Sequence, residues 1–224
     1  MKNSLIVLLI CTIVFVPVLI PADGASDEIT GGLTVSGTVE GIQTREVTSI
    51  IATGTITDAV AAATSDPTCA DPNSIITLLE RIYYETNIDI DKSLMIKGAG
   101  KEESIVDGGE DGTVFIIEPD NVVTMKEMTI RDGYNEIDDG LGGGIRNFGT
   151  LTLENVLITG NTAYRGSGIF NGGTLNLMGV SITDNIPSDS IISLGAGIYN
   201  DGMRRFNPAD TIGIVNMYAG TTIS

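Results

Sequence analysis

The sequence predicts an all-β fold, a right-handed parallel β-helix of about five coils with a short capping helix at its N-terminal end. The first observation is a repeat, because Gly142–Asn161 recurs as Gly166–Asn185, 24 positions later. The second is that apolar residues in each unit alternate with Thr, Asn or Ser, which is the pattern of a strand with one buried face. The third is composition, because frequent glycine with Thr, Val and Ile disfavours helical and leucine-rich repeats.

One coil of this size cannot bury its apolar face alone, so the units are expected to stack with a spacing of about 4.8 Å. Stacking places equal residues on each other, for example Leu151 on Leu175 and Asn147 on Asn171. The asparagine amides are then expected to hydrogen-bond along the stack and to satisfy backbone groups at the corners.

Composition narrows the function classes. The chain has 224 residues, 28 glycines and 42% apolar residues. This composition fits one solenoid domain with glycines at the corners of its coils, together with flanking segments. Twelve basic and 29 acidic residues give a net charge of −17, so nucleic acid and anionic membranes are poor partners. The sequence has no histidine, which excludes histidine-based triads and histidine-ligated zinc. We expect no cofactor and no resident metal.

Residues 1–24 have the pattern of a signal peptide. Lys2 supplies a positive start, Leu5–Ile20 is an uncharged run of 16 residues, and Ala22 and Gly24 are the small residues of a cleavage site. Cleavage after Gly24 would make this a secreted or cell-surface protein. An uncleaved membrane anchor is the alternative, although 16 residues are slightly short for a span.

Residues 25–72 are predicted to be an extended leader or linker with one or two strands, for example at Val47–Ile51. Cys69 would be the single cysteine of the exported chain, free or paired with another molecule. The segment Ser74–Tyr84 has apolar residues at helical spacing, and we expect a short amphipathic helix there that covers the first coil.

Residues 73–224 form the predicted β-helix. Leu94 to Val123 is 29 residues and Val123 to Leu151 is 28, so the coils stay in frame with short insertions. The repeat pattern recurs at Gly195–Asn200 and again at Gly213–Ser224, where the last coil is incomplete. An uncapped last coil exposes strand edges, and we expect self-association through this end.

The repeats resemble pectin-lyase-like β-helices of bacterial and archaeal surface proteins, especially adhesin-like proteins and polymorphic outer-membrane proteins. The motifs that carry the resemblance are Leu94–Gly100, Ile105–Gly109, Met128–Gly133 and the Gly-Gly-Gly-Ile-x-Asn-x-Gly-Thr-Leu-Thr-Leu unit at 142–153. The resemblance implies the fold and a place at the cell surface. It leaves function open, because this fold carries lyases, hydrolases and non-enzymatic adhesins.

An enzyme is the alternative reading. By resemblance, lyases of this fold place acidic calcium ligands beside a basic Lys or Arg, and the nearest set here combines three acids with either of two arginines. These residues are Asp132, Asp138, Asp139, Arg131 and Arg146. Arginine is a poor base, and such acids are more often solvated loop residues, so we expect no catalysis.

The binding hypothesis depends on one column of outward residues. Arg146, Phe170 and Tyr199 occupy the same outward position in successive coils, between an inward Ile and a corner Asn. Stacked as an exposed strip, they would suit the apolar faces and hydroxyls of sugars. A ladder that only supports coil stacking is the alternative. We therefore expect a non-catalytic surface protein for adhesion or glycan binding, with a polysaccharide-degrading enzyme or an envelope spacer as alternatives.

Overall fold

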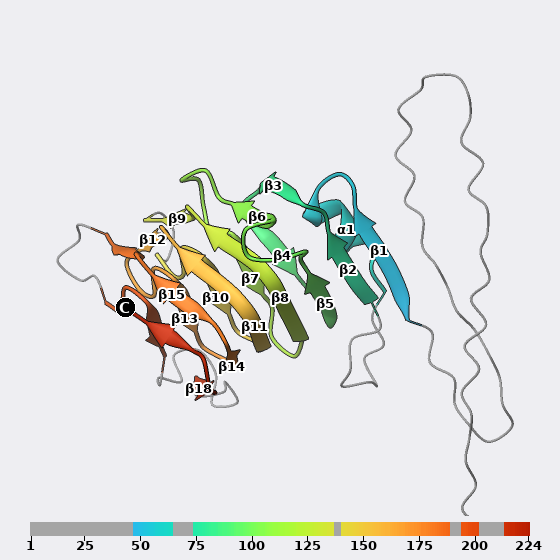
Figure 1. Ribbon diagram of the computed structural model, residues 1–224. Coiled ribbons are helices and arrows are strands. Elements are labelled where there is room, and N and C mark those ends of the chain that lie inside the picture. The colour runs from blue at the N-terminus through green and yellow to red at the C-terminus, as the bar shows by residue number, and fades with distance from the viewer. Residues whose placement is uncertain (1–46, 65–73, 137–139, 189–193, 202–212) are drawn as a thin grey trace, which may run out of the picture.

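The computed structural model describes residues 47–64, 74–136, 140–188, 194–201 and 213–224, which form a parallel β-solenoid of about five turns (Figure 1). The all-β solenoid predicted from the sequence is confirmed. The first strands are β1 (Thr48–Ala52), β2 (Ser74–Leu78), β3 (Arg81–Tyr84), β4 (Ile88–Ile90), β5 (Leu94–Lys97), β6 (Ser104–Asp107), β7 (Phe115–Ile117), β8 (Val122–Arg131) and β9 (Tyr134–Asn135). The later strands are β10 (Ile145–Asn147), β11 (Thr150–Thr159), β12 (Thr162–Ala163), β13 (Ile169–Asn171), β14 (Thr174–Met178), β15 (Ser181–Thr183), β16 (Ile186–Pro187), β17 (Ile198–Asn200), β18 (Ile214–Met217) and β19 (Thr222–Ile223). The described residues contain one helix, α1 (Ile56–Ala62).

The strands form three parallel sheets that are the walls of the solenoid. The first is an eleven-stranded sheet with the path β1-β2-β5-β8-β11-β14-β18, which β3, β6, β15 and β19 join. The second is a five-stranded sheet ordered β17-β13-β10-β7-β4, and the third is a short sheet ordered β16-β12-β9. Figure 1 shows the long sheet running from β1 at one end to β18 at the other, so successive turns extend this wall strand by strand.

The core consists of columns of aliphatic side chains, one from each turn. Leu151 pairs with Val123 on one side and with Leu175 on the other, and all three side chains are fully buried. The same holds for the columns through Leu153 and Ile158. The register predicted from the 24-residue repeat, and its continuation to Leu94, is therefore confirmed.

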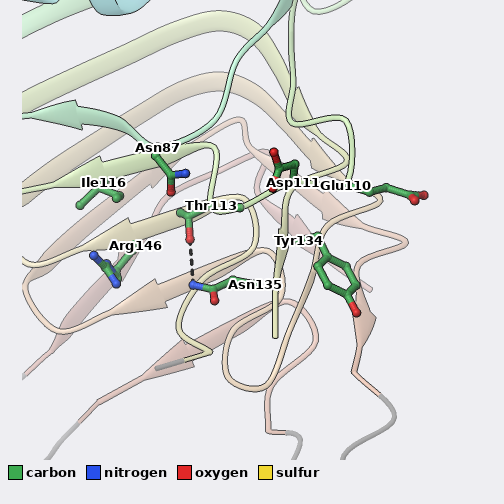
Figure 2. Close-up of a pocket in the computed structure, with 9 residues that line it drawn as sticks. Asn87, Glu110, Asp111, Thr113, Ile116, Tyr134, Asn135 and Arg146 are labelled. Atoms are coloured by element: carbon green, nitrogen blue, oxygen red, sulfur yellow. Dashed lines mark hydrogen bonds between the residues drawn. The ribbon is translucent and has the colours of Figure 1, made fainter. Parts of the chain in front are cut away.

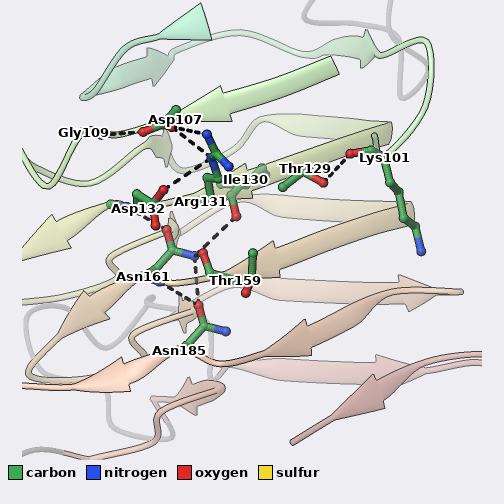
Figure 3. Close-up of polar contacts among 11 residues, drawn as sticks. Lys101, Asp107, Gly109, Thr129, Ile130, Arg131, Asp132, Thr159, Asn161 and Asn185 are labelled. Atoms are coloured by element: carbon green, nitrogen blue, oxygen red, sulfur yellow. Dashed lines mark hydrogen bonds and ion pairs between the residues drawn. The ribbon is translucent and has the colours of Figure 1, made fainter. Parts of the chain in front are cut away.

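Two asparagine ladders hold the corners of the coils. Asn147 Nδ2 donates to Asn171 Oδ1 over 2.7 Å, and Asn171 Nδ2 donates to Asn200 Oδ1 over 2.8 Å. The predicted Asn147–Asn171 ladder is thus confirmed, and it also bonds corner carbonyls such as that of Gly173. A second ladder links Asn161 Nδ2 to Asn185 Oδ1 over 2.9 Å (Figure 3). Buried amides that are fully bonded in this way fix the register of the turns.

Left-handed backbone recurs at equivalent points of the turns. Gly142, Gly166 and Gly195 have φ of 66°, 65° and 69°, at the start of each unit of the five-stranded sheet. A Cβ built on Gly166 would lie 2.1 Å from the carbonyl oxygen of Ile169, so both conformation and space require glycine at this corner.

The predicted helix at Ser74–Tyr84 is wrong, because this segment forms strands β2 and β3. Its apolar residues fit both helical spacing and a period of two, and β2 alternates buried and half-buried residues from Ser74 to Leu78. Four β-branched residues, Ile75, Ile76, Thr77 and Ile82, together with parallel pairing to β1 and β5, favour the strands.

The short helix lies earlier, at α1, inside the segment predicted as a leader. It packs against β1, β2 and β4 with Ile56, Ala59 and Val60 buried. The Glu85 carboxylate accepts from the backbone N–H groups of Ile56 at 2.6 Å and Thr57 at 3.1 Å, which satisfies the first turn of α1. β1 pairs with β2 throughout its length, so this part of the leader is already the first strand of the long sheet.

Several sequence expectations fall outside the described residues. The signal peptide at 1–24, its cleavage site, residues 25–46 and Cys69 are among them, and they stay predictions. Among the described residues, no helix is long and apolar enough to cross a membrane.

Candidate functional site

The outer face of the five-stranded sheet carries the residues that the sequence singled out. Arg146 on β10 pairs with Phe170 on β13, and Phe170 pairs with Tyr199 on β17. The column continues in the other direction to Ile116 on β7 and Asp89 on β4. The structure thus brings together the three predicted residues, in the predicted order.

Aromatic rings are stacked along this column. The Phe170 and Tyr199 rings are nearly parallel, with centroids 5.7 Å apart and an interplanar angle of 17°. On the other side, Phe148 meets Phe170 edge to face, with centroids 5.8 Å apart and planes at 62°. The Arg146 Cζ lies 5.8 Å from the centroid of the Phe148 ring, within the range of a cation–π contact. We call Arg146, Phe148, Phe170 and Tyr199 the aromatic column.

Phe148 was missed by sequence reasoning. It follows the corner residue Asn147, and the equivalent position of the next unit is Gly172. A Cβ built on Gly172 would come within 3.0 Å of Phe148 Cδ1, so the glycine leaves room for the ring. The exchange of Phe for Gly between two otherwise similar units is the signal that could have found it.

The exposure of the strip differs from the prediction. Phe170 is only 2% exposed, whereas Arg146, Phe148 and Tyr199 are half-buried. The reason is that Phe170 contacts two other rings, with Tyr199 stacked on it and Phe148 meeting it edge to face. The accessible part of the column is therefore formed by its two ends, and Phe170 connects them.

A pocket of about 310 Å³ adjoins the Arg146 end of the column (Figure 2). Arg146 and Ile116 form one side of it, next to each other on the five-stranded sheet. The remaining lining residues come from the turns that enter neighbouring strands: Asn87, Glu110, Asp111, Gly112, Thr113, Tyr134 and Asn135.

The base of the pocket is fixed by hydrogen bonds. Thr113 and Asn135 are buried, and Asn135 Nδ2 donates to Thr113 Oγ1 over 3.0 Å (Figure 2). Thr113 Oγ1 in turn donates to the carbonyl of Gly142 over 2.6 Å. Asn87, Glu110 and Asp111 are exposed. The pocket therefore combines a rigid polar base, an aliphatic wall and solvent-facing amide and carboxylate groups.

The acidic residues considered for catalysis form a different arrangement. Arg131 Nη2 lies 2.7 Å from Asp107 Oδ2, and Arg131 Nε lies 3.3 Å from Asp132 Oδ2 (Figure 3). Asp138 and Asp139 lie outside the described residues. Burial raises the pKa of the Asp132 carboxyl, with Asp107 and Glu110 adding to the rise and Arg131 opposing it. Arginine stays protonated in proteins, so Arg131 serves here as a cation between two carboxylates rather than as a base.

In the part of the chain that the structure describes, no group of three or more Asp, Glu, Cys or His side chains is placed to hold a metal ion. No protein-family model, no curated protein and no solved structure gives a significant match to this chain. The function must therefore be argued from the geometry of the aromatic column and its pocket.

Proposed function

We propose that this protein is an exported, non-catalytic surface β-solenoid of the pectin-lyase-like type that binds glycans. The observation that carries the proposal is the continuity between the aromatic column and the pocket, which share Arg146. An aromatic surface and a polar cavity side by side are the two elements of a typical sugar-binding site.

The chemistry of each part supports this ligand class. Half-buried Tyr199 and Phe148 offer aromatic surface to the C–H faces of a sugar ring, and they hold a fixed orientation through Phe170. The amide of Asn87 and the carboxylates of Glu110 and Asp111 offer acceptors for hydroxyl groups. The pocket volume of about 310 Å³ is at the lower end of the range for small-molecule sites, about 300–1,000 Å³. One monosaccharide unit of a longer chain suits that size.

The fold and the sequence support a surface location. Parallel solenoids present long, rigid faces for extended ligands. The predicted signal peptide at 1–24 would deliver the chain outside the cytoplasm, and the net charge of −17 keeps it away from anionic polymers.

A glycan array probed with the chain from Ala25, the form that the predicted cleavage leaves, tests the proposal. Retention on one class of glycan is expected, and Tyr199→Ser and Arg146→Ala should each reduce it at least several-fold. Tyr84→Ser is the matched control, because Tyr84 is 73% exposed on β3 in the other large sheet. The Tyr84→Ser variant should bind the same glycans as strongly as the parent chain.

Two outcomes would redirect the proposal. Unchanged retention by both site variants, with far-UV circular dichroism equal to that of the parent chain, would leave the column with a stacking role only. Release of unsaturated sugars in the presence of calcium would instead support the polysaccharide-lyase alternative.

A further inference from the structure

The pocket that adjoins the aromatic column has charged groups on two of its sides. Arg146 supplies a cation, and Glu110 and Asp111 supply two carboxylates. Figure 2 shows Arg146 and Asp111 on opposite sides of the hydrogen bond between Thr113 and Asn135 that forms the base. The two kinds of charge are therefore kept apart, and a ligand in this pocket meets a cationic side and an anionic side.

The anionic side is built on a tight turn between β6 and β7 that the backbone holds in place. The N–H of Glu110 donates to the carbonyl of Asp132 over 2.7 Å, and the N–H of Tyr134 on β9 donates to the carbonyl of Gly112 over 2.8 Å. The side chains of Glu110 and Asp111 face solvent. In the described part of the chain, neither carboxylate is paired with a Lys or Arg. Both carboxylates are therefore available to a ligand, on a turn of fixed shape.

Further carboxylates adjoin the lining. Asp89 on β4 pairs in register with Ile116, one of the lining residues, on the outer face of the five-stranded sheet. Glu136 Oε2 accepts a hydrogen bond of 2.6 Å from the hydroxyl of Tyr134, another lining residue. Arg146 is thus the single cation among the lining residues, against two acids in the lining and two acids next to it. The electrostatic potential of the pocket is negative on balance, which favours a cationic ligand group.

We propose that the sugar unit that enters this pocket carries a free amino group, so that the protein binds glycans containing unacetylated hexosamine. This inference rests on the proposed glycan-binding function and names its ligand class. The ammonium group contacts the carboxylates of Glu110 and Asp111, and hydroxyl groups on the other side of the sugar ring accept hydrogen bonds from the Arg146 guanidinium.

Other sugar units fit the same charges less well. An N-acetyl group replaces the ammonium by a neutral amide, so the attraction to the two carboxylates is lost. The carboxylate of a uronic acid adds a charge of the same sign as most of the groups around the pocket, which repel it. The aromatic column is indifferent to this difference, because it contacts the C–H faces that all these sugars share.

Calorimetric titration of the chain from Ala25 with two tetrasaccharides tests the inference. One tetramer is β-1,4-linked glucosamine with its amines protonated, and the other is the same chain fully N-acetylated. The glucosamine tetramer is expected to bind about fivefold more tightly, a difference of the size that exposed charge pairs provide. This preference should shrink as salt rises from about 0.01 M to about 1 M, because salt screens exposed charges.

Isosteric variants assign the preference to its residues. Glu110→Gln and Asp111→Asn each remove one carboxylate with little change in size, and the double variant should bind the two tetramers equally. Asp120→Asn is the matched control, because Asp120 is an exposed acid in the turn after β7 and does not line the pocket. The control variant should keep the full preference for the glucosamine tetramer.

The outcomes separate this inference from the proposed function. Equal affinity of the parent chain for the two tetramers, or tighter binding of the N-acetylated one, would overturn the amine preference and leave glycan binding in place. Binding of neither tetramer would also overturn it, and the glycan array would then decide the proposed function separately, since that test accepts any class of glycan. A preference that survives in the double variant would overturn the role assigned to Glu110 and Asp111.

Discussion

Replacing Asn171 by alanine removes one accepted hydrogen bond and both donor hydrogens of a side-chain amide from the interior of one corner. Asn171 is fully buried and accepts from Asn147 Nδ2 at 2.7 Å. The two hydrogens of its own Nδ2 are shared among three acceptors, the carbonyls of Gly173 and Ile214 at 3.0 and 3.1 Å and Asn200 Oδ1 at 2.8 Å. Alanine has no group that can replace any of these contacts.

The expected loss follows from the number of bonds. A neutral buried hydrogen bond contributes roughly 1 kcal/mol net, so the one accepted bond and the two donated bonds give about 3 kcal/mol. The partners left behind lie in a closed corner, where water cannot easily replace the amide. A change of this size is large against the usual stability of a domain, roughly 5–15 kcal/mol.

Urea unfolding followed by far-UV circular dichroism measures the effect, with the slope checked for a change in cooperativity. Asn176→Ala is the matched control, because Asn176 lies five positions away on the outer, half-buried side of β14. It bonds Thr152 Oγ1 at 3.3 Å and Asn216 Nδ2 at 2.8 Å, where solvent can substitute. Its loss should cost less than about 1 kcal/mol. Equal losses for the two variants would refute the argument that burial makes the corner ladder strong.

Three further predictions concern the inward columns, the Asp132 carboxyl and the N-terminal segment. Leu153→Asp puts a carboxylate into a fully buried column and should cost several kcal/mol, whereas Thr152→Asp on the outer face should be nearly silent in the same urea assay. Because the pKa of Asp132 is raised, the folded state retains its proton to higher pH than the unfolded state, and stability falls as pH rises through that interval. Asp132→Asn should therefore stabilise at neutral pH, and thermal melts should show this gain shrinking as the pH falls through that interval toward 3.8, the ordinary pKa of the carboxyl. N-terminal sequencing of the exported protein should begin at Ala25; recovery of Met1 from the envelope fraction would indicate an anchor.

The sequence predicted the fold well where two units could be compared. Residues 142–161 and 166–185 align without a gap, so facing, register and the Asn147–Asn171 ladder followed directly. At Ser74–Tyr84 there was no second copy to compare, and six apolar residues fitted two periods equally well. Pairing with β1 and β5, which is a property of the assembled sheet, decided for strands.

The candidate site could be predicted only in part. The column of Arg146, Phe170 and Tyr199 follows from repeat alignment, but burial of Phe170 depends on Phe148, which has no aromatic equivalent in the next unit. The pocket draws Asn87, Glu110 and Tyr134 from three different turns. Loops of unequal length separate these turns, so their meeting point is set by three-dimensional packing and not by spacing.

The constant strand register has a consequence for how such a molecule can change over evolutionary time. Between neighbouring strands of the long sheet the chain advances by 20 residues at Ile75–Met95, 24 at Leu151–Leu175 and 40 at Leu175–Val215, yet the wall stays regular. Loops therefore absorb insertions at little cost to the walls. Duplication of the 24-residue unit would join ends whose side chains already match. Each duplicated unit would lengthen the solenoid by about 4.8 Å. Its inward side chains would already fit the core columns, so only its outward residues would be free to change.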